Sequence, residues 1–183
     1  MIVMDKHKPS HVPTHNDLPA DVRKDMSKLL NQLLANAADM YSQAKQAHWN
    51  VRGRDFFSLH ELFDKVSQEV LDHADQIAER AGQLGYAVSG TIRQAAAASS
   101  LKEYPLEIAS GEEHVEQLSS SLGQYNKTIR DGIDQADKGG DAVTTDTLTR
   151  ICGSSDKLLW FVESHGTMLR ADVPAKAMKS AAA

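Results

Sequence analysis

Four long stretches of the chain repeat apolar residues every three or four positions, which is the spacing of one face of an α-helix. They cover about 18–48, 56–84, 110–138 and 142–169. Only five of the 183 residues are proline, the residue that most strongly disrupts a helix interior. Amphipathic helices of this length bury their apolar faces against one another. The pattern therefore predicts an all-α domain, a four-helix bundle.

The segments between and beyond these helices set the expected domain boundaries. About 25 residues separate the second helix from the third, whereas most connections in a compact domain are far shorter. We interpret this segment as a long crossover connector that runs the length of the bundle, and "TIRQAAAAS" predicts a short helix within it. We expect a flexible N-terminal tail over 1–16, one bundle domain over 17–170, and a flexible C-terminal tail over 171–183.

Several helix ends are marked by residues that commonly cap or stop helices. Asp17, followed by Pro19, predicts the start of the first helix. Ser110 stands three residues before Glu113, so the two predict a capping box at the start of the third helix. Gly85 predicts the end of the second helix.

The charge and the cysteine content narrow the range of functions. The formal net charge is −5, and a mildly acidic surface favours cations over the phosphates of nucleic acid. Cys152 is the single cysteine, which rules out a disulfide within the chain and fits a reducing compartment. The first residues lack the apolar core of a signal peptide, and no apolar run is long enough to cross a membrane. These features predict a soluble, cytoplasmic protein.

The second helix carries two pairs of candidate metal ligands on one face. His60 and Asp64 are four residues apart, and so are Asp75 and Glu79, a spacing that makes side chains neighbours on a helix. Asp64 and Asp75 are eleven residues apart, which is three turns plus roughly 20°, so both pairs point the same way. The same eleven residues span roughly 16 Å. One helix cannot bring both pairs to one ion, because oxygen and nitrogen ligands lie at about 2.0–2.5 Å from a metal.

A two-fold axis removes this difficulty. If two copies of the helix lie antiparallel and cross near Glu69 and Val70, the first pair of one copy faces the second pair of the other, and the dimer has two equivalent sites. A mixed set of histidine and carboxylate suits Fe(II), with Mn(II) and Zn(II) as alternatives. His48, at the end of the first helix, offers another nitrogen. No glutamate is followed by histidine three residues later, which disfavours the di-iron site inside the bundle that such a motif would build.

Each of these residues also has a simpler interpretation. His60 with Asp64 is equally compatible with a surface ion pair, and His48 with a packed or capping histidine. Asp75 with Glu79 is harder to explain without a cation, since like charges at this spacing destabilise a helix. We expect structural roles for the histidines in the helix cores, and either a second metal site or a solvated segment for those near the N-terminus: His73 and His165 in the first group, His7, His11 and His15 in the second.

Four segments resemble one known family. They are "KQAHWNVRG" (45–53), "LHELFD" (59–64), "LDHADQIAERAGQLG" (71–85) and, more weakly, "DKLLWFVESH" (156–165). The spacing His-x11-His-x3-Asp-x10-Asp-x3-Glu within them is specific. On these motifs the chain resembles the Dps family, the mini-ferritins named as DNA-binding proteins from starved cells.

The resemblance implies a ferritin-like four-helix bundle with a short helix in the long crossover connector. It also implies a homododecamer, a hollow shell that oxidises Fe(II), preferentially with hydrogen peroxide, stores the Fe(III) mineral and so protects DNA from oxidative damage in the bacterial cytoplasm. The implied di-iron ferroxidase centre lies at the two-fold dimer interface. Its implied ligands are His48, His60 and Asp64 of one subunit with Asp75 and Glu79 of the other.

Further roles follow from the same resemblance. Trp49 matches a tryptophan beside the centre that intercepts stray oxidising equivalents, and Asp146 and Asp156 match acids that line iron-entry pores. The family name also raises DNA as a partner, through lysines and an arginine near the two ends of the chain. The alternative function is therefore a nucleoid-associated DNA-binding protein in which iron oxidation is secondary, and a third is a helical bundle without metal chemistry.

Overall fold

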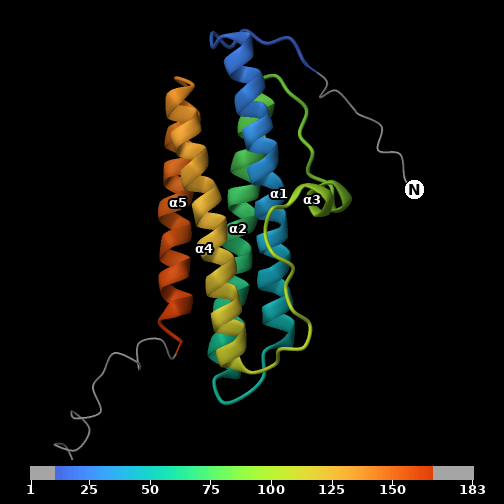
Figure 1. Cartoon of the computed structure of the whole chain (residues 1–183), viewed down its shortest axis with the longest axis vertical. Coiled ribbons are helices and arrows are strands. Elements are labelled where there is room, and N and C mark those ends of the chain that lie inside the picture. Colours follow the sequence, from blue (N-terminus) through green and yellow to red (C-terminus); the bar gives the residue numbers. More distant parts are fainter. Residues whose placement is uncertain (1–10, 167–183) are drawn as a thin grey trace, which may run out of the picture.

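The computed structural model describes residues 11–166, and this part of the chain forms five helices and no β-strand (Figure 1). Four of the helices are long, and one short helix stands in the connector between the second and third long ones. The predicted all-α fold, a four-helix bundle with a short helix in the long connector, is confirmed. The helices are α1 (Ala20–Asn50), α2 (Phe56–Gln83), α3 (Ile92–Ala98), α4 (Gly111–Lys138) and α5 (Ala142–Glu163).

The bundle consists of two antiparallel pairs, α1 with α2 and α4 with α5. The long connector leaves the end of α2, carries α3 along the outside of α1 and returns to the opposite end of the bundle, where α4 begins (Figure 1). A backbone bond from Arg52 N to Ala109 O, 2.9 Å long, joins this end of the connector to the α1–α2 loop. The connector therefore crosses the whole length of the bundle, and α3 covers one side of α1.

The apolar stripes predicted from the sequence meet in one core. Burying such side chains contributes about 1.5–3 kcal/mol each, which makes this core the main source of stability. Most of the apolar side chains that α2 contributes to the core are fully buried, with Leu59 and Ala74 4% and 8% exposed. Asp75 and Glu79 of the same helix are exposed, so the face that carries the candidate ligands lies beside the core. The largest fully buried apolar side chains are Leu30, Leu33, Met40, Phe63, Ile77, Leu84, Leu118, Leu122, Tyr125, Ile129, Leu148 and Ile151.

Two predicted helix ends differ from the structure. Ser110 and Glu113 form the capping box that was expected, but Asp17 does not cap α1, whose N-cap position is taken by Pro19. α5 ends at Glu163 and not near residue 169, because the Ser164 hydroxyl donates to the carbonyl of Trp160 and the chain turns there. Apolar periodicity does not reveal either helix end, because a helix begins and ends where its local backbone bonding changes.

Part of the predicted N-terminal tail is attached to the bundle. Val12 N donates to Gly85 O at 2.8 Å, and His11 forms an isolated antiparallel bridge with Tyr86. The buried guanidinium of Arg23 donates to the carbonyls of both Leu18 and Leu84. Residues 11–16 thus lie against the C-terminal turn of α2, and only residues 1–10 of that predicted tail lie outside the described part.

Gly85 is required where this segment crosses the end of α2. Its φ is +84°, and a Cβ there would lie 2.7 Å from Val12 O and 3.0 Å from a methyl of Thr14. We expect Gly85→Ala to lower the free energy of unfolding by about 1–3 kcal/mol, because strain and a backbone clash act together. Urea unfolding measures the change.

Gly153→Ala is the matched control for that substitution. Gly153 is helical, and a Cβ there would meet nothing within 4 Å. This variant should be more stable than the parent by about 0.5–1 kcal/mol. If Gly85→Ala is as stable as the parent, the packing of residues 11–16 against the end of α2 does not contribute to stability.

Candidate metal centre

His48 and His60 hold each other in place. His48 Nδ1 lies 2.8 Å from the carbonyl oxygen of His60, and His60 Nδ1 lies 2.9 Å from that of His48. A carbonyl only accepts, so each Nδ1 carries the proton and each Nε2 is left as the potential metal ligand. The rings stack with centroids 3.7 Å apart and planes 20° from parallel. The sharp loop between α1 and α2, with Gly53 at φ +116°, makes this pairing possible.

Asp64 is held by donors from two helices. Its Oδ1 accepts from Lys45 Nζ on α1 at 2.7 Å, and its Oδ2 accepts from Gln68 Nε2 on α2 at 2.8 Å. The bond from Lys45 is the main reason why the pKa of Asp64 lies below its usual value. In the described part of the chain the cationic partner of Asp64 is thus Lys45 and not His60. A metal ion that binds Asp64 has to compete with this ammonium group.

Asp75 and Glu79 lie further along α2, exposed, and form no hydrogen bond or ion pair with any described residue. Within residues 11–166 no three histidine, cysteine or acidic side chains gather closely enough to hold a metal ion. The structure of one chain thus pairs His48 with His60 beside Asp64 and leaves Asp75 with Glu79 apart. The ligand set remains a prediction, and its parts occupy separate positions on one face of α2.

Trp49 directly follows His48 and is 60% exposed. The ammonium of Lys45 lies 5.8 Å from the centre of its indole ring, within the range of a cation–π contact. Lys45 therefore contacts both Trp49 and Asp64. The role of Trp49 beside a metal centre stays a prediction.

Comparison with known proteins identifies the family. A family model described as "Ferritin-like domain" matches residues 27–171. A "DNA protection during starvation protein" of Agrobacterium fabrum is 38% identical over 152 residues, covering 83% of this chain and 94% of the relative. The chain belongs to the Dps family.

Solved Dps structures share the fold. Mycobacterium smegmatis Dps in its tetragonal form matches with a TM-score of 0.79 at 28% identity, covering 85% of this chain and 93% of that one. Dps from Microbacterium arborescens "in the high iron form" matches with a TM-score of 0.75 at 26% identity, covering 85% of this chain and 98% of that one. The described helices of the present Dps chain include none that is long and apolar enough to cross a membrane.

The two predicted pore acids already have basic partners on their own chain. Asp146 forms an ion pair with Arg150 at 3.2 Å. Asp156 accepts from Arg130 at 2.6 and 2.7 Å and from Asn126 at 2.9 Å. A role in an iron pore stays a prediction for this Dps chain, and it would require these carboxylates to share their charge between an arginine and a cation.

The other histidines of the Dps chain have varied surroundings. His73 is 2% exposed, which agrees with a structural role, although neither ring nitrogen bonds to a described residue. Burial lowers its pKa. His165 bonds the carbonyl of Phe161, while His11 and His15 join no metal-binding group in the described part and His7 lies outside it.

His114 is a buried histidine that the sequence did not single out. The hydroxyl of Tyr104 lies 2.8 Å from its Nδ1, which ties the long connector to α4. Burial is the main cause that lowers the pKa of His114. The spacing of His114 from the apolar residues of α4 was the one sign in the sequence that it could be buried. Histidine is common on protein surfaces as well, so this spacing alone does not identify a buried side chain.

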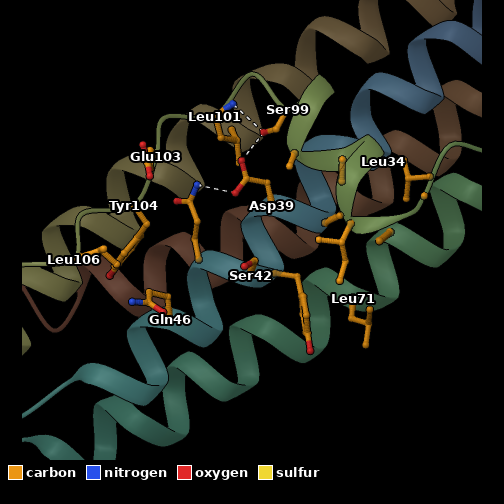
Figure 2. A pocket seen from close by; sticks show the side chains of 18 residues that line it. Leu34, Asp39, Ser42, Gln46, Leu71, Ser99, Leu101, Glu103, Tyr104 and Leu106 are labelled. Carbon is orange, nitrogen blue, oxygen red and sulfur yellow. Dashed lines mark hydrogen bonds between the residues drawn. The ribbon is translucent and has the colours of Figure 1, made fainter. Parts of the chain in front are cut away.

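An open groove lies next to the ligand face of α2. It has a volume of about 830 Å³ and is lined by α1, α2, α3 and the connector, with Leu71 and Leu34 towards one end and Tyr104 towards the other (Figure 2). A shallower depression of about 390 Å³ beside it includes Leu71 and Asp75. Leu71 is 51% and Ile92 is 89% exposed. The surface around Asp75 is thus apolar and without a partner in the described part of one chain.

Proposed function

We propose that this Dps chain is an iron-sequestering ferroxidase. It oxidises Fe(II), preferentially with hydrogen peroxide, and stores the Fe(III) product inside a homododecamer. The observation that carries the proposal is the reciprocal bonding of His48 and His60. In each ring Nδ1 is used in a hydrogen bond to a backbone carbonyl. The two Nε2 atoms stay available as ligands, one for each iron of a two-iron centre.

The second half of each centre comes from a second copy. In an antiparallel pair of α2 helices centred between residues 69 and 70, His60 faces Glu79 and Asp64 faces Asp75 of the other copy. Two observations support this pairing: Asp75 and Glu79 are exposed and without partners among the described residues, and the surface beside them is apolar. Burial of that surface would supply the association energy, and Fe(II) would relieve the repulsion between the carboxylates.

The ligand set fits the chemistry. Fe(II) is the substrate, and carboxylate oxygens stabilise the Fe(III) product more than the reactant because its charge is higher. Two Fe(II) ions each lose one electron, and the two electrons with two protons break the O–O bond of hydrogen peroxide and form two water molecules. Pairing the irons lets both electrons reach one peroxide, so no hydroxyl radical is released. Trp49, exposed beside the histidines, is placed to reduce any oxidant that escapes.

Substitution of Asp75 tests the function. We expect Asp75→Asn to oxidise Fe(II) with hydrogen peroxide at least about tenfold more slowly than the parent, because an amide oxygen neither carries charge nor bridges cations as well. Stopped-flow absorbance of Fe(III), with peroxide or dissolved oxygen as the oxidant, measures both the rate and the preference between oxidants.

Asp134→Asn is the matched control. Asp134 is also an exposed acid of a long helix, but it lies on α4 and not on α2, so this variant should oxidise iron as the parent does. Equal rates for Asp75→Asn and the parent would refute the assigned site, and a parent no faster than iron in buffer would refute the function.

Protection of DNA follows from the same reaction. The Agrobacterium fabrum relative carries the name "DNA protection during starvation protein", and removing Fe(II) and peroxide together protects DNA without contact. Direct DNA binding is the alternative. The basic residues that the sequence offers for it, among them Lys6, Lys8 and Lys176, lie outside the described part of the chain, so the proposal rests on the iron chemistry.

A further inference from the structure

Gln68 lies at the centre of the ligand face of α2. It follows Asp64 by one helical turn, and its side-chain amide donates to Asp64 Oδ2 at 2.8 Å. The residue is exposed in the single chain. Glutamine and aspartate at this spacing commonly bond to each other on a helix, and here the aspartate is one of the candidate metal ligands.

The two oxygens of Asp64 differ in the kind of donor that each holds. Lys45, bound to Oδ1 at 2.7 Å, is a cation and repels any metal ion that approaches. Gln68, bound to Oδ2, is neutral and can keep its bond while a metal binds the carboxylate. The hydroxyl of Ser67 lies 3.5 Å from Oδ1 and is too far to fix the group. Among the described residues, Gln68 is therefore the one close donor to the Asp64 carboxylate that is compatible with a bound metal.

We propose that Gln68 is a positioning residue for the metal centre, and that its amide fixes the rotation of the Asp64 carboxylate so that Oδ1 faces the shared cation once Lys45 withdraws. This inference rests on the proposed function. Groups that bond to metal-ligating carboxylates orient them and commonly change metal affinity by about 10- to 100-fold. Gln68 acts through Asp64 and touches no substrate.

The register of the proposed helix pair also places Gln68 at the contact with the second copy. In the antiparallel pair centred between residues 69 and 70, position 68 faces position 71 of the other copy. Leu71 is 51% exposed in the single chain, and in the pair this apolar side chain would cover the amide of Gln68. Exclusion of water strengthens a hydrogen bond. Assembly would thus lock Asp64 in place at the moment when Asp75 of the second copy completes the site.

Binding of Co(II) tests the inference without any turnover. Co(II) accepts the same nitrogen and oxygen ligands, and its visible absorption reports their number and geometry. We expect Gln68→Met to bind Co(II) about tenfold more weakly than the parent and with an altered spectrum. Methionine keeps the length and the helix propensity of glutamine but donates no hydrogen bond. Particle size and melting temperature should not change.

Gln76→Met is the matched control, because Gln76 is also an exposed glutamine of α2 but lies off the ligand face. It should bind Co(II) as the parent does. If Gln68→Met has the affinity and spectrum of the parent, Gln68 does not position Asp64, whereas the centre itself stands. If Asp75→Asn and the parent bind Co(II) alike, the centre is misassigned and the role of Gln68 falls with it. An assembly defect in Gln68→Met with unaltered binding per site would also overturn the inference.

Discussion

Two inactive variants of this chain should restore ferroxidase activity when they assemble together. The first variant carries His60→Ala and Asp64→Asn, and the second carries Asp75→Asn and Glu79→Gln. Each variant alone should oxidise Fe(II) little faster than buffer does, because every centre in its particles lacks half of the ligands. This expectation follows from the geometry of α2, along which eleven residues between the two halves span roughly 16 Å.

Particles that contain both variants should recover part of the activity. In a mixed dimer one centre combines the intact halves of both chains, and the other centre combines both damaged halves. With equal amounts and random pairing, half of the dimers are mixed and each has one intact centre. The particles should therefore have about a quarter of the intact centres that parent particles have. Co-expression with two different affinity tags, followed by successive purification on both, isolates the mixed particles, and the rate of Fe(III) formation gives the recovered fraction.

Two comparisons decide what such a result means. Particles of each variant that are assembled separately and then mixed without exchange should stay inactive. Inactive mixed particles of normal size would refute a centre shared between two copies. Activity in the second variant alone would show that His48, His60 and Asp64 suffice for oxidation.

The second large effect concerns a buried ion pair that joins α2 to α5. Asp141 is 1% exposed, and Arg80 Nη2 donates to both of its oxygens, at 2.8 and 3.0 Å. Arg80 Nε donates to the hydroxyl of Thr144 at 2.9 Å. Asp141 is also the N-cap of α5 and accepts from Thr144 N at 3.0 Å. One carboxylate thus neutralises a buried cation and starts a helix.

Asp141→Ala should lower the free energy of unfolding by about 3–5 kcal/mol, because it leaves the guanidinium of Arg80 buried without a counter-charge. Urea unfolding monitored by circular dichroism measures the loss. Asp131→Ala is the control, since Asp131 pairs with Lys127 on the surface, where both side chains are more than half exposed, and its loss should be about 0–1 kcal/mol. A similar loss in both variants would mean that the buried pair contributes no more than a surface pair.

The loss of unfolding free energy in Asp141→Ala should also depend on pH. Burial alone would raise the pKa of Asp141, but the bonds from Thr144 and Arg80 outweigh it and hold the pKa below its usual value. A carboxyl with a lowered pKa stabilises the fold above its unfolded pKa of about 3.9 and loses this contribution as the pH falls through the folded value. The deficit of Asp141→Ala should therefore be constant near neutral pH and shrink below about pH 4.

The architecture, and the placing of four candidate ligands on one face of α2, could be predicted from the sequence. Apolar spacing depends only on the helix repeat, so it gave the four long helices, the core stripes and the shared face of His60, Asp64, Asp75 and Glu79. It also gave the capping box at Ser110, because that motif is local. The predictions failed at two helix ends: Asp17 does not cap α1, and α5 ends at Glu163, several residues before its apolar spacing stops.

The contacts that hold the side chains of the candidate site could not be predicted from the sequence. No repeat in the sequence indicates which side chains bond to each other there. Three sets of contacts show this: the bonds between His48 and His60, those of Lys45 and Gln68 to Asp64, and that of Tyr104 with His114. Most of them join residues on different helices or segments, and each depends on a rotamer and on which neighbours the packing supplies. The helix repeat is a property of the backbone and can be read from the order of residues. A side chain's partner is a property of the whole packed structure, because many rotamers fit the same sequence and only packing selects one.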